Sequence, residues 1–413
     1  MENSKRLLII GFVFPEPASS AAGTRMLQLI DLFKMQGFEI TFASPASDSE
    51  FAFDLLKIGV QKVSIVLNDA SFDNFAAQLN PNVVLFDRFM MEEQFGWRIS
   101  ENCPHAIRIL DTEDLHCLRL ARQNAWKSKV EFQTEMLFSD VAKREIASIL
   151  RCDLTLMISE FEIELLQNQF KISPPLLHYL PLFVDQELLM DSQNLTKFDE
   201  RENFIFIGNF LHEPNWNAVL YLKESIWPKI KEKLPEAELN IYGAYSSQKV
   251  LNLHNQTQGF IIKNRAEDVY EVMKYAKVCL APLRFGAGIK GKLLDAMVTG
   301  TPNVTTKVGA ESMHGSIAWS GFIADTTNDF VSGAVDLYSN ESKWINAQSN
   351  GFEICQKRYL KEKFETQFTL VINEIQNDIT KRRKFNFIGE ILKHHTLSST
   401  KFMSKWIEEK NKK

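Results

Sequence analysis

The stretch VCLAPLRFGAGIKGKLLDA, residues 278–296, contains the unit that decides the predicted fold. Its first six residues form an apolar run of the kind that makes a buried strand. Three glycines follow, and the residues from Lys292 onward have the pattern of a helix. A buried strand that leads through a short loop into a helix is the repeating unit of a parallel α/β sheet.

The same unit repeats through the second half of the chain. Helical patterns at Asn217–Glu232 and Glu267–Tyr275 separate short apolar runs. The other strands predicted in this half cover residues 203–210, 238–243, 259–263, 302–306 and 321–325. Strands that alternate with helices in this way predict a second parallel sheet, separate from any sheet in the first half.

The first half follows the same rule with a different sequence. Helical patterns lie at Arg25–Lys34 and Phe161–Phe170. The predicted strands cover residues 6–14, 38–44, 82–86, 106–110 and 154–159. Because these runs are apolar on both faces, they are typical of strands that helices cover on both sides. We therefore expect an α/β protein with two Rossmann-like, doubly wound domains facing each other across a cleft, and 413 residues suit two such domains.

The polar segment QELLMDSQNLTKFDEREN, residues 186–203, is typical of a linker between domains. We place an N-terminal domain at residues 1–195, a C-terminal domain at 196–380 and a basic helical tail at 381–413. The tail carries ten Lys or Arg residues against three Glu. We favour a tail that packs its aromatic side chains on the first domain. The alternative is attachment to an acidic membrane surface through the same side chains, Phe385, Phe387, Phe402 and Trp406.

The composition excludes several classes of function. With 45% hydrophobic residues, 24% charged residues and a net charge of −5, nothing indicates nucleic acid as a partner. The five cysteines form no Cys-x-x-Cys pair, so neither a disulfide framework nor a zinc site is indicated. Neither His-x-x-x-His nor an Asp-x-Asp after a strand is present, so we expect no metal and no cofactor. A reducing, cytoplasmic location fits these features.

The N-terminus has the pattern of a secretory signal peptide, because Lys5-Arg6 precedes the apolar run LLIIGFVF and the small residues ASSAAG. The run is only eight residues long, prolines follow it, and a helical pattern resumes at Thr24. We therefore interpret it as the first buried strand. Every other apolar stretch is well short of the roughly 18 residues that a membrane helix needs.

The glycine-rich loop inside residues 278–296 has the chemistry of a diphosphate site. Glycines free the backbone to approach a ligand, and the start of a helix attracts anions. Cationic side chains at the same place add charge-assisted hydrogen bonds. The residues concerned are Arg284, Gly286, Gly288, Lys290, Gly291 and Lys292. One turn later, Asp295 can accept hydrogen bonds from ribose hydroxyls, or it can act only as a partner of the helix dipole.

Two known phosphate motifs do not explain this loop. The Walker pattern is absent, and although the glycines match Gly-x-Gly-x-x-Gly, no acidic residue ends the next strand. A second loop, GNFLHEPNWNA at residues 208–218, also leads from a strand into a helix. There Gly208 allows close backbone approach, whereas Asn215 alone is more often a helix cap.

Titratable residues gather after two strands of the first domain. Asp111, Glu113, Asp114 and His116 lie within six residues of one strand end. Such a group can bind an acceptor hydroxyl or transfer a proton. Asp87 and Arg88 follow another strand, and Gly23 provides a close backbone approach before the first helix. We expect Gly23, Asp87, Arg88 and Asp111 to bind the acceptor, and Asp114 and His116 to orient or deprotonate it.

Two stretches, APLRFGAGIKGKLLDAMVTGTPNVTTKVGAE and FIFIGNFLHEPNWNAV, resemble the second domain of GT-B fold glycosyltransferases of the family-4 type. The resemblance covers residues 200–340 and, more loosely, the first domain. It implies a nucleotide-sugar held by the C-terminal domain, an acceptor held by the N-terminal domain, and a retaining, metal-independent reaction.

The resemblance also assigns roles to residues. Of the family's two carboxylates, the one that contacts ribose falls on Asp295, and the other falls on Ala287, where it is missing. Backbone amides of Ala287, Gly288 and Ile289 then have to contact the donor sugar. Lys290 and Lys292 take the charge role, because the first loop of the domain offers Asn209 and His212 instead. Lys263 lies where the family's backbone holds the base.

The function expected from these features is transfer of a hexose-type sugar from a nucleotide-sugar to a glycan or lipid-linked acceptor, in the synthesis of surface polysaccharide or glycolipid. The missing carboxylate at Ala287 motivates a first alternative, an inactive module that binds a nucleotide or glycan. A second alternative is a sugar-nucleotide epimerase. That enzyme needs acid and base groups on both faces of the sugar ring, and the second domain offers no convincing pair.

Overall fold

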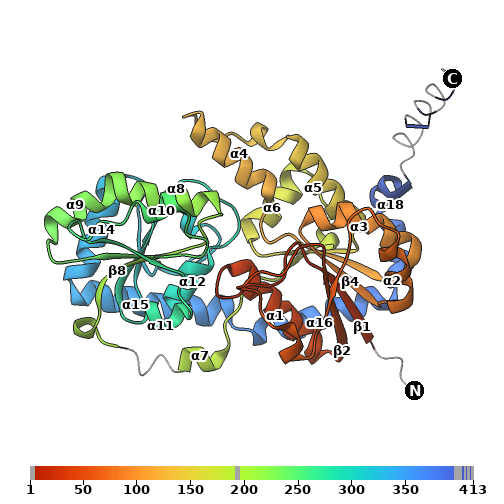
Figure 1. Cartoon of the computed structure of the whole chain (residues 1–413), viewed down its shortest axis with the longest axis horizontal. Coiled ribbons are helices and arrows are strands. Elements are labelled where there is room, and N and C mark those ends of the chain that lie inside the picture. The colour runs from red at the N-terminus through yellow and green to blue at the C-terminus, as the bar shows by residue number, and fades with distance from the viewer. Residues whose placement is uncertain (1–4, 191–195, 395–401, 404–405, 407–409, 411–413) are drawn as a thin grey trace.

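The computed structural model describes residues 5–190 and 196–394, together with residues 402, 403, 406 and 410. Two parallel sheets lie side by side, each covered by helices (Figure 1). The described strands form a seven-stranded sheet in the order β3-β2-β1-β4-β5-β6-β7 and a six-stranded sheet in the order β10-β9-β8-β11-β12-β13. None of the described helices has the length and apolarity to cross a bilayer.

The first domain winds around the seven-stranded sheet. Its strands are β1 (Lys5–Ile10), β2 (Phe38–Ser44), β3 (Gln61–Ser64), β4 (Val83–Asp87), β5 (Ile107–Asp111), β6 (Leu154–Met157) and β7 (Leu177–Tyr179). Its helices are α1 (Ala21–Met35), α2 (Ser71–Leu79), α3 (Phe89–Asn102), α4 (His116–Lys127), α5 (Asp140–Arg151) and α6 (Glu160–Gln169), and α7 (Gln186–Met190) follows. The four residues Leu7–Ile10 of β1 are completely buried, so the N-terminal apolar run forms an interior strand between β2 and β4.

The second domain repeats this architecture. Its strands are β8 (Glu202–Ile207), β9 (Leu239–Tyr242), β10 (Phe260–Asn264), β11 (Ala276–Ala281), β12 (Asn303–Thr305) and β13 (Gly321–Ile323). Its helices are α8 (Glu213–Tyr221), α9 (Trp227–Lys233), α10 (Gln248–Leu251), α11 (Val269–Met273), α12 (Gly291–Val298), α13 (Lys307–Ala310), α14 (Thr327–Ser339) and α15 (Glu341–Ile354). A π-helical turn at Leu222–Ile226 joins α8 to α9, where the sequence predicted one helix.

All strands predicted in both halves are present, so the α/β class with two Rossmann-like, doubly wound domains is confirmed. Two further strands, β3 and β7, were not predicted from the sequence. These strands have four and three residues, QKVS and LHY, and form the two edges of the first sheet. Edge strands are short and polar, and therefore lack the continuous apolar run that marks a central strand.

The predicted end of the second domain at residue 380 is wrong. After α15 the chain crosses back, and Leu360 forms a bridge with Val184. The next helix, α16 (Glu362–Asn377), lies beneath the first sheet (Figure 1) and buries Phe368 against Phe33, with ring centroids 5.3 Å apart. An amphipathic helix does not show in its sequence which domain it covers. The other expected boundary, at 195/196, borders residues 191–195, which lie outside the described residues.

The first part of the basic tail lies on the first domain as α17 (Ile379–Phe385) and α18 (Phe387–His394). The contact is polar: Arg383 Nη2 donates to Asp153 Oδ2 at 2.8 Å, and Asn386 Nδ2 donates to the Leu150 carbonyl at 2.7 Å. The expected packing of aromatic side chains is wrong, because Phe385 and Phe387 remain 80% and 67% exposed. Most of residues 395–413 lie outside the described part of the chain.

Candidate functional site

The glycine-rich loop between β11 and α12 adopts a conformation that two of its glycines require. Gly288 has φ +63°, and Gly286 has φ +156°. A Cβ at Gly288 would lie 2.9 Å from Ile158 Cδ1 and 3.0 Å from Asp114 Cβ, both in the first domain. The loop therefore presses directly against the opposite domain, with no room for a side chain.

Lys292, in the first turn of α12, lies beside the loop that follows β8. Its Nζ donates to Asn215 Oδ1, and it lies 4.4 Å from the ring centroid of Phe206. A Cβ at Gly208 would come within 2.9 Å of Lys292 Nζ, so glycine is needed there for close approach. The structure thus brings Gly208, Asn215 and Lys292 together. Asn209 closes the group, since its carbonyl accepts from Asn215 Nδ2 at 3.0 Å.

The charged groups on α12 and before it are partly buried. Burial lowers the pKa of Lys292 to about 7 and that of Lys290 to about 8. Burial raises the pKa of Asp295 to about 7, opposed by Lys292 one turn away. An incoming diphosphate would stabilise the charged form of both lysines, because an opposite charge nearby favours ionisation.

The first domain contributes a second charged group at the start of α4. Arg119 Nη1 contacts both carboxylate oxygens of Asp114, at 2.9 and 2.7 Å. Burial would raise the pKa of Asp114, but Arg119 and His116 outweigh it and lower that pKa. His116 Nδ1 lies 3.4 Å from Asp114 Oδ1 and 3.5 Å from Glu145 Oε1. Glu145 also caps the helix, because the His116 and Cys117 amides each donate to it at 2.9 Å.

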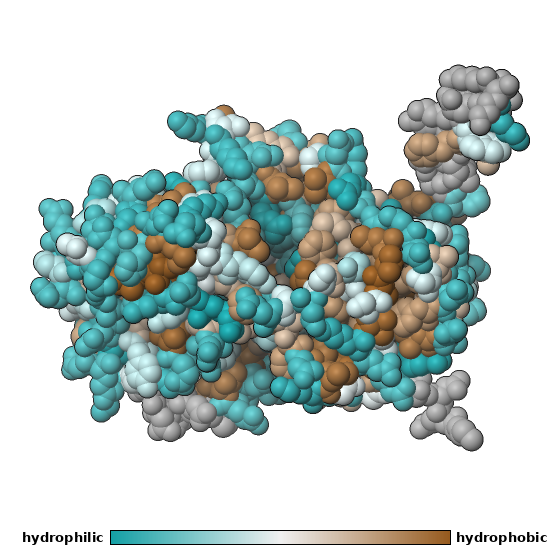
Figure 2. Space-filling view, viewed as in Figure 1, coloured by the Kyte–Doolittle hydropathy of each residue, from teal (hydrophilic) through white to brown (hydrophobic). Residues whose placement is uncertain are grey.

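These two groups face each other across the junction of the domains. Lys290 and His212 from the second domain both help to lower the pKa of Asp114. Gly291 lies against Ala21, so the starts of α12 and α1 also meet there. Figure 2 shows a hollow between the domains with a hydrophilic floor. Asp114, His116, Lys290 and Lys292 therefore share one charged cleft.

Other first-domain candidates have structural partners. Asp111 is fully buried and forms a bidentate ion pair with Arg25. Arg25 Nη2 lies 2.7 Å from Asp111 Oδ1. It cannot touch an acceptor, so its predicted role is wrong. Gly23 packs within its own loop, where a Cβ would meet the Glu16 backbone at 2.3 Å.

Asp87 and Arg88 are close to the cleft but also have partners. Asp87 Oδ2 accepts from the Phe12 amide at 3.0 Å, and its Oδ1 lies 3.6 Å from Arg88 Nε. Arg88 and Glu113 both have positive φ, +70° and +62°, and follow neighbouring strands. Strain of this kind in residues other than glycine clusters at functional sites.

Two second-domain candidates lie apart from the charged cleft. The Arg284 guanidinium lies between the Trp126 and Tyr221 rings, at 4.6 and 4.4 Å, and Nε donates to Asn217 Oδ1 at 2.8 Å. It therefore joins α4 to the second domain and does not reach the site with Lys290. Lys263 is exposed at the end of β10, and no contact among the described residues links it to the cleft.

Comparisons with known proteins add the following. The model of the family "Glycosyl transferases group 1" matches residues 201–340. Sucrose-phosphate synthase from Thermosynechococcus elongatus superposes with a TM-score of 0.66, at 14% identity, over 90% of this chain and 99% of that one. The two parallel sheets of this chain have the GT-B fold. Residues 201–340 thus match a glycosyltransferase family within a chain of GT-B fold.

Two further relatives are similar to this GT-B chain. Anabaena HepE, solved with UDP and glucose, has a TM-score of 0.63 at 12% identity, covering 89% of this chain and 99% of its own. An uncharacterized 44.6 kDa protein in the cps region of Klebsiella pneumoniae is 22% identical over 293 residues, which are 67% of this chain and 72% of that protein.

Within the glycosyltransferase domain, the position of the missing carboxylate is occupied by a buried alanine. Ala287 is 8% exposed and packs into the apolar cluster of the first domain. Asp295, the other expected carboxylate position, lies one turn after Lys292 on α12. Among the described residues, no cluster of three or more metal-ligand side chains is present.

Two residues of the domain junction, Glu162 and Arg122, were not predicted from the sequence. Glu162 Oε1 accepts from the Gly288 amide at 2.6 Å. Arg122 contacts both oxygens of Glu311, at 2.8 and 2.7 Å, and the Gly286 carbonyl at 3.0 Å. Neither residue belongs to a motif, and only the packing of the domains brings each to its partner.

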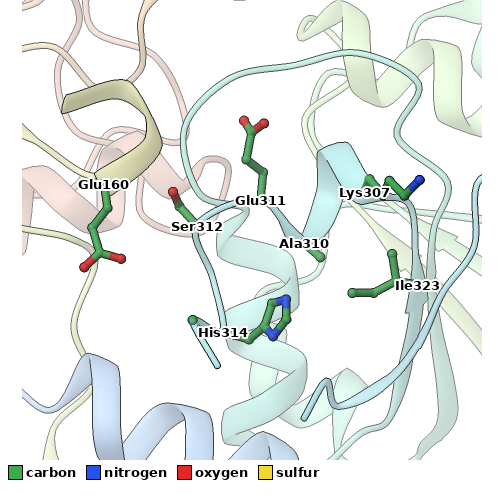
Figure 3. Close-up of a pocket in the computed structure, with 8 residues that line it drawn as sticks. Glu160, Lys307, Ala310, Glu311, Ser312, His314 and Ile323 are labelled. Atoms are coloured by element: carbon green, nitrogen blue, oxygen red, sulfur yellow. The ribbon is translucent and has the colours of Figure 1, made fainter. Parts of the chain in front are cut away.

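A separate hollow of about 240 Å³ opens at the same junction (Figure 3). Glu160 of α6 lies on one side, and Lys307, Ser312, His314 and Ile323 of the second domain lie on the other. It contains none of the cleft lysines. This hollow is therefore separate from the candidate site.

Proposed function

We propose that the protein transfers a hexose-type sugar from a nucleotide-sugar to an acceptor hydroxyl, with retention of the anomeric configuration. The observation that carries the proposal is the convergence of Lys290, Lys292 and the start of α12 on a cleft that Asp114 and His116 line from the other domain. A helix start with two cations fits a diphosphate. HepE, which was solved with UDP and glucose, supports a nucleotide-sugar as donor.

In this proposal the second domain stabilises the leaving group. As the bond to the sugar breaks, negative charge develops on the nucleoside diphosphate, and Lys290 and Lys292 neutralise it. Preorganised charge in a site that excludes water is worth more than the same charge in water. Asp295, one turn further along α12, accepts hydrogen bonds from the ribose hydroxyls, as the resemblance implies.

The first domain presents the acceptor. Asp114 is held in place by Arg119 and stays ionised, and His116 lies between Asp114 and Glu145. These side chains orient the acceptor hydroxyl toward the donor sugar. Closure of the domains excludes water, which would otherwise hydrolyse the donor.

The relative in the Klebsiella cps region supports a role in the synthesis of surface polysaccharide, with a glycan or lipid-linked acceptor. We propose a cytoplasmic location, where nucleotide-sugars serve as donors. No cofactor or metal enters the proposed reaction, since the leaving group's charge is balanced by lysines.

The test is a panel of nucleotide-sugars, screened first by thermal shift and then by product analysis. A ligand at 100 times its dissociation constant stabilises by about 2.7 kcal/mol, so the true donor raises the melting temperature clearly. We expect glycosylated product with one donor and an acceptor present. Binding without turnover would identify a binding module instead. This outcome is tested because Ala287 stands where the family has a carboxylate. Free epimerised sugar would indicate an epimerase.

We further propose that the tail contacts an anionic membrane surface. Phe385, Phe387 and Ile388 are 80%, 67% and 60% exposed, and the 33 residues from Lys381 carry ten cations against three Glu. Exposed aromatic side chains beside excess positive charge suit an anionic lipid surface. The full chain should sediment with vesicles of 70% phosphatidylcholine and 30% phosphatidylglycerol, and a Phe385→Ser, Phe387→Ser variant should not. Equal sedimentation of both proteins, or none of the parent, would contradict this.

A further inference from the structure

Glu162 is a completely buried carboxylate in the first turn of α6, on the first-domain side of the domain junction. Ser159 caps this helix, and its Oγ accepts from the Glu162 amide at 3.4 Å. A buried carboxylate costs free energy unless it is hydrogen-bonded. The stability of Glu162 in this position therefore depends on its hydrogen-bond partners.

One such partner lies in the other domain. Glu162 Oε1 accepts from the Gly288 amide at 2.6 Å, across 126 residues of sequence. Two features of the loop allow the contact. Gly288 has φ +63° and no side chain that would strike Ile158, and Ala287 is small enough to pack into the apolar cluster of the first domain.

The same peptide units are also held from the other side. Lys290 Nζ donates to the carbonyls of Ala287 and Gly288. The loop is thus fixed by its amide to Glu162 and by its carbonyls to the lysine that faces the cleft. A movement of the Gly288 peptide away from Glu162 would displace the Lys290 ammonium with it.

The link does not depend on the charge of Glu162. Burial is the main cause that raises the pKa of Glu162 to about 8, and the negative charge of Asp114 adds to it. The Gly288 amide, Lys290 and the Leu115 amide act in the opposite direction. The second oxygen, Oε2, makes no hydrogen bond of ordinary geometry within the described structure. A proton can therefore reside on Oε2 while Oε1 still accepts from Gly288.

We propose that Glu162 is a positioning residue: by holding the Gly288 amide, it fixes the glycine loop and Lys290 in the place from which they meet the donor. The identity of the ligand rests on the proposed function. The link between Glu162 and the loop does not, and it can be measured without any donor.

The first experiment is hydrogen exchange of the full chain. In Glu162→Ala, peptides covering residues 284–292 should exchange roughly 10- to 100-fold faster than in the parent, as expected when a buried amide loses its hydrogen-bond partner. Glu162→Gln keeps a carbonyl acceptor and should exchange like the parent. The matched control is Glu160→Gln on the same helical turn. Glu160 pairs with Arg358 across the junction, and among the described residues it makes no hydrogen bond to the glycine loop.

Parent-like exchange in Glu162→Ala would overturn the link. Equal loosening of residues 284–292 in Glu160→Gln would also overturn it, because it would show a general loss of domain contact. If Glu162→Ala does not fold, Glu162→Asp serves instead. The aspartate side chain is one methylene shorter, so its carboxylate lies further from the Gly288 amide. Hydrogen exchange in this loop should therefore also be faster than in the parent.

The second experiment uses the donor that the panel identifies. Glu162→Ala should lower kcat/KM for the donor by roughly 10- to 100-fold, while KM for the acceptor stays unchanged and Glu162→Gln recovers to within about threefold of the parent. Parent-like kinetics with a loosened loop would overturn the positioning role. A parent that turns over no nucleotide-sugar would refute the proposed function, while the exchange result still decides the link.

Discussion

At the scale of single residues, Lys292 and Asp295 are opposite charges held at positions where each is costly. Both have a pKa of about 7, lowered for the lysine and raised for the carboxyl by burial. Neither is fixed in one charge state near neutral pH. A ligand that brings negative charge can therefore change the protonation of this helix when it binds.

Asp295→Asn tests the environment of this carboxyl through stability. The native pKa of Asp295 is above its unfolded value of 3.8, so its contribution is fully present below pH 4 and is lost as pH rises to about 7. The asparagine variant stays neutral and has no such loss. The free energy of unfolding of the parent should therefore fall relative to that of the variant between pH 4 and 7. Urea denaturation across this range measures it, and a constant difference would contradict it.

Residue-level roles were only partly predictable from sequence. Lys290, Lys292, Asp114 and His116 follow strand ends, and the edge of a parallel sheet brings such residues together. Asp111 follows a strand in the same way, yet it pairs with Arg25, 86 residues earlier, which no spacing rule reveals. Glu162 and Arg122 were missed for the same reason, since their partners lie in the other domain.

At the scale of elements, the unit of β11, glycine loop and α12 was predicted as the structure has it. The continuous apolar run marks the strand, and the glycines mark the loop. The short edge strands β3 and β7 lack such a run. The placement of α16 depends on which domain has an uncovered face, and this is a property of the assembled sheet.

Gly288→Ala tests whether the glycine loop must fit against the first domain. An alanine at φ +63° costs about 1–2 kcal/mol, and its Cβ would lie 2.9 Å from Ile158 Cδ1. The matched control is Gly37→Ala, at φ +79° with nothing within 4 Å of the added Cβ. Both variants should lose the conformational term, but only Gly288→Ala should lose a further 1–3 kcal/mol, roughly, from overpacking. Chemical denaturation measures both, and equal losses would contradict the fit.

At the scale of the whole molecule, the two domains are held together by contacts that span the cleft. Arg122 joins α4 to Glu311 and to the glycine loop, and Tyr245 donates to Glu16 Oε1 at 2.7 Å. Charged contacts of this kind can break and re-form when domains close around a ligand. The chain crosses between the domains near Val184 and Leu360, which pair in a short parallel bridge.

Arg122→Ala should shift the molecule toward an open form. It removes three hydrogen bonds across the cleft and leaves Glu311 without its partner. The radius of gyration from small-angle X-ray scattering should increase. Arg144→Ala is the control, because Arg144 makes the same kind of bidentate pair with Glu93 inside the first domain. Scattering curves that coincide for the parent and both variants would show that Arg122 does not hold the domains closed.

The most direct test of the central proposal is the affinity for a nucleoside diphosphate, measured by isothermal titration calorimetry at one ionic strength. The account predicts that Lys290→Ala and Lys292→Ala each weaken the binding of the parent's preferred nucleoside diphosphate by roughly tenfold or more, since each removes a charge-assisted hydrogen bond. Lys263→Ala, at the exposed end of β10, provides a comparison outside the cleft. Unchanged dissociation constants in both cleft variants would contradict the assignment of the diphosphate to this loop.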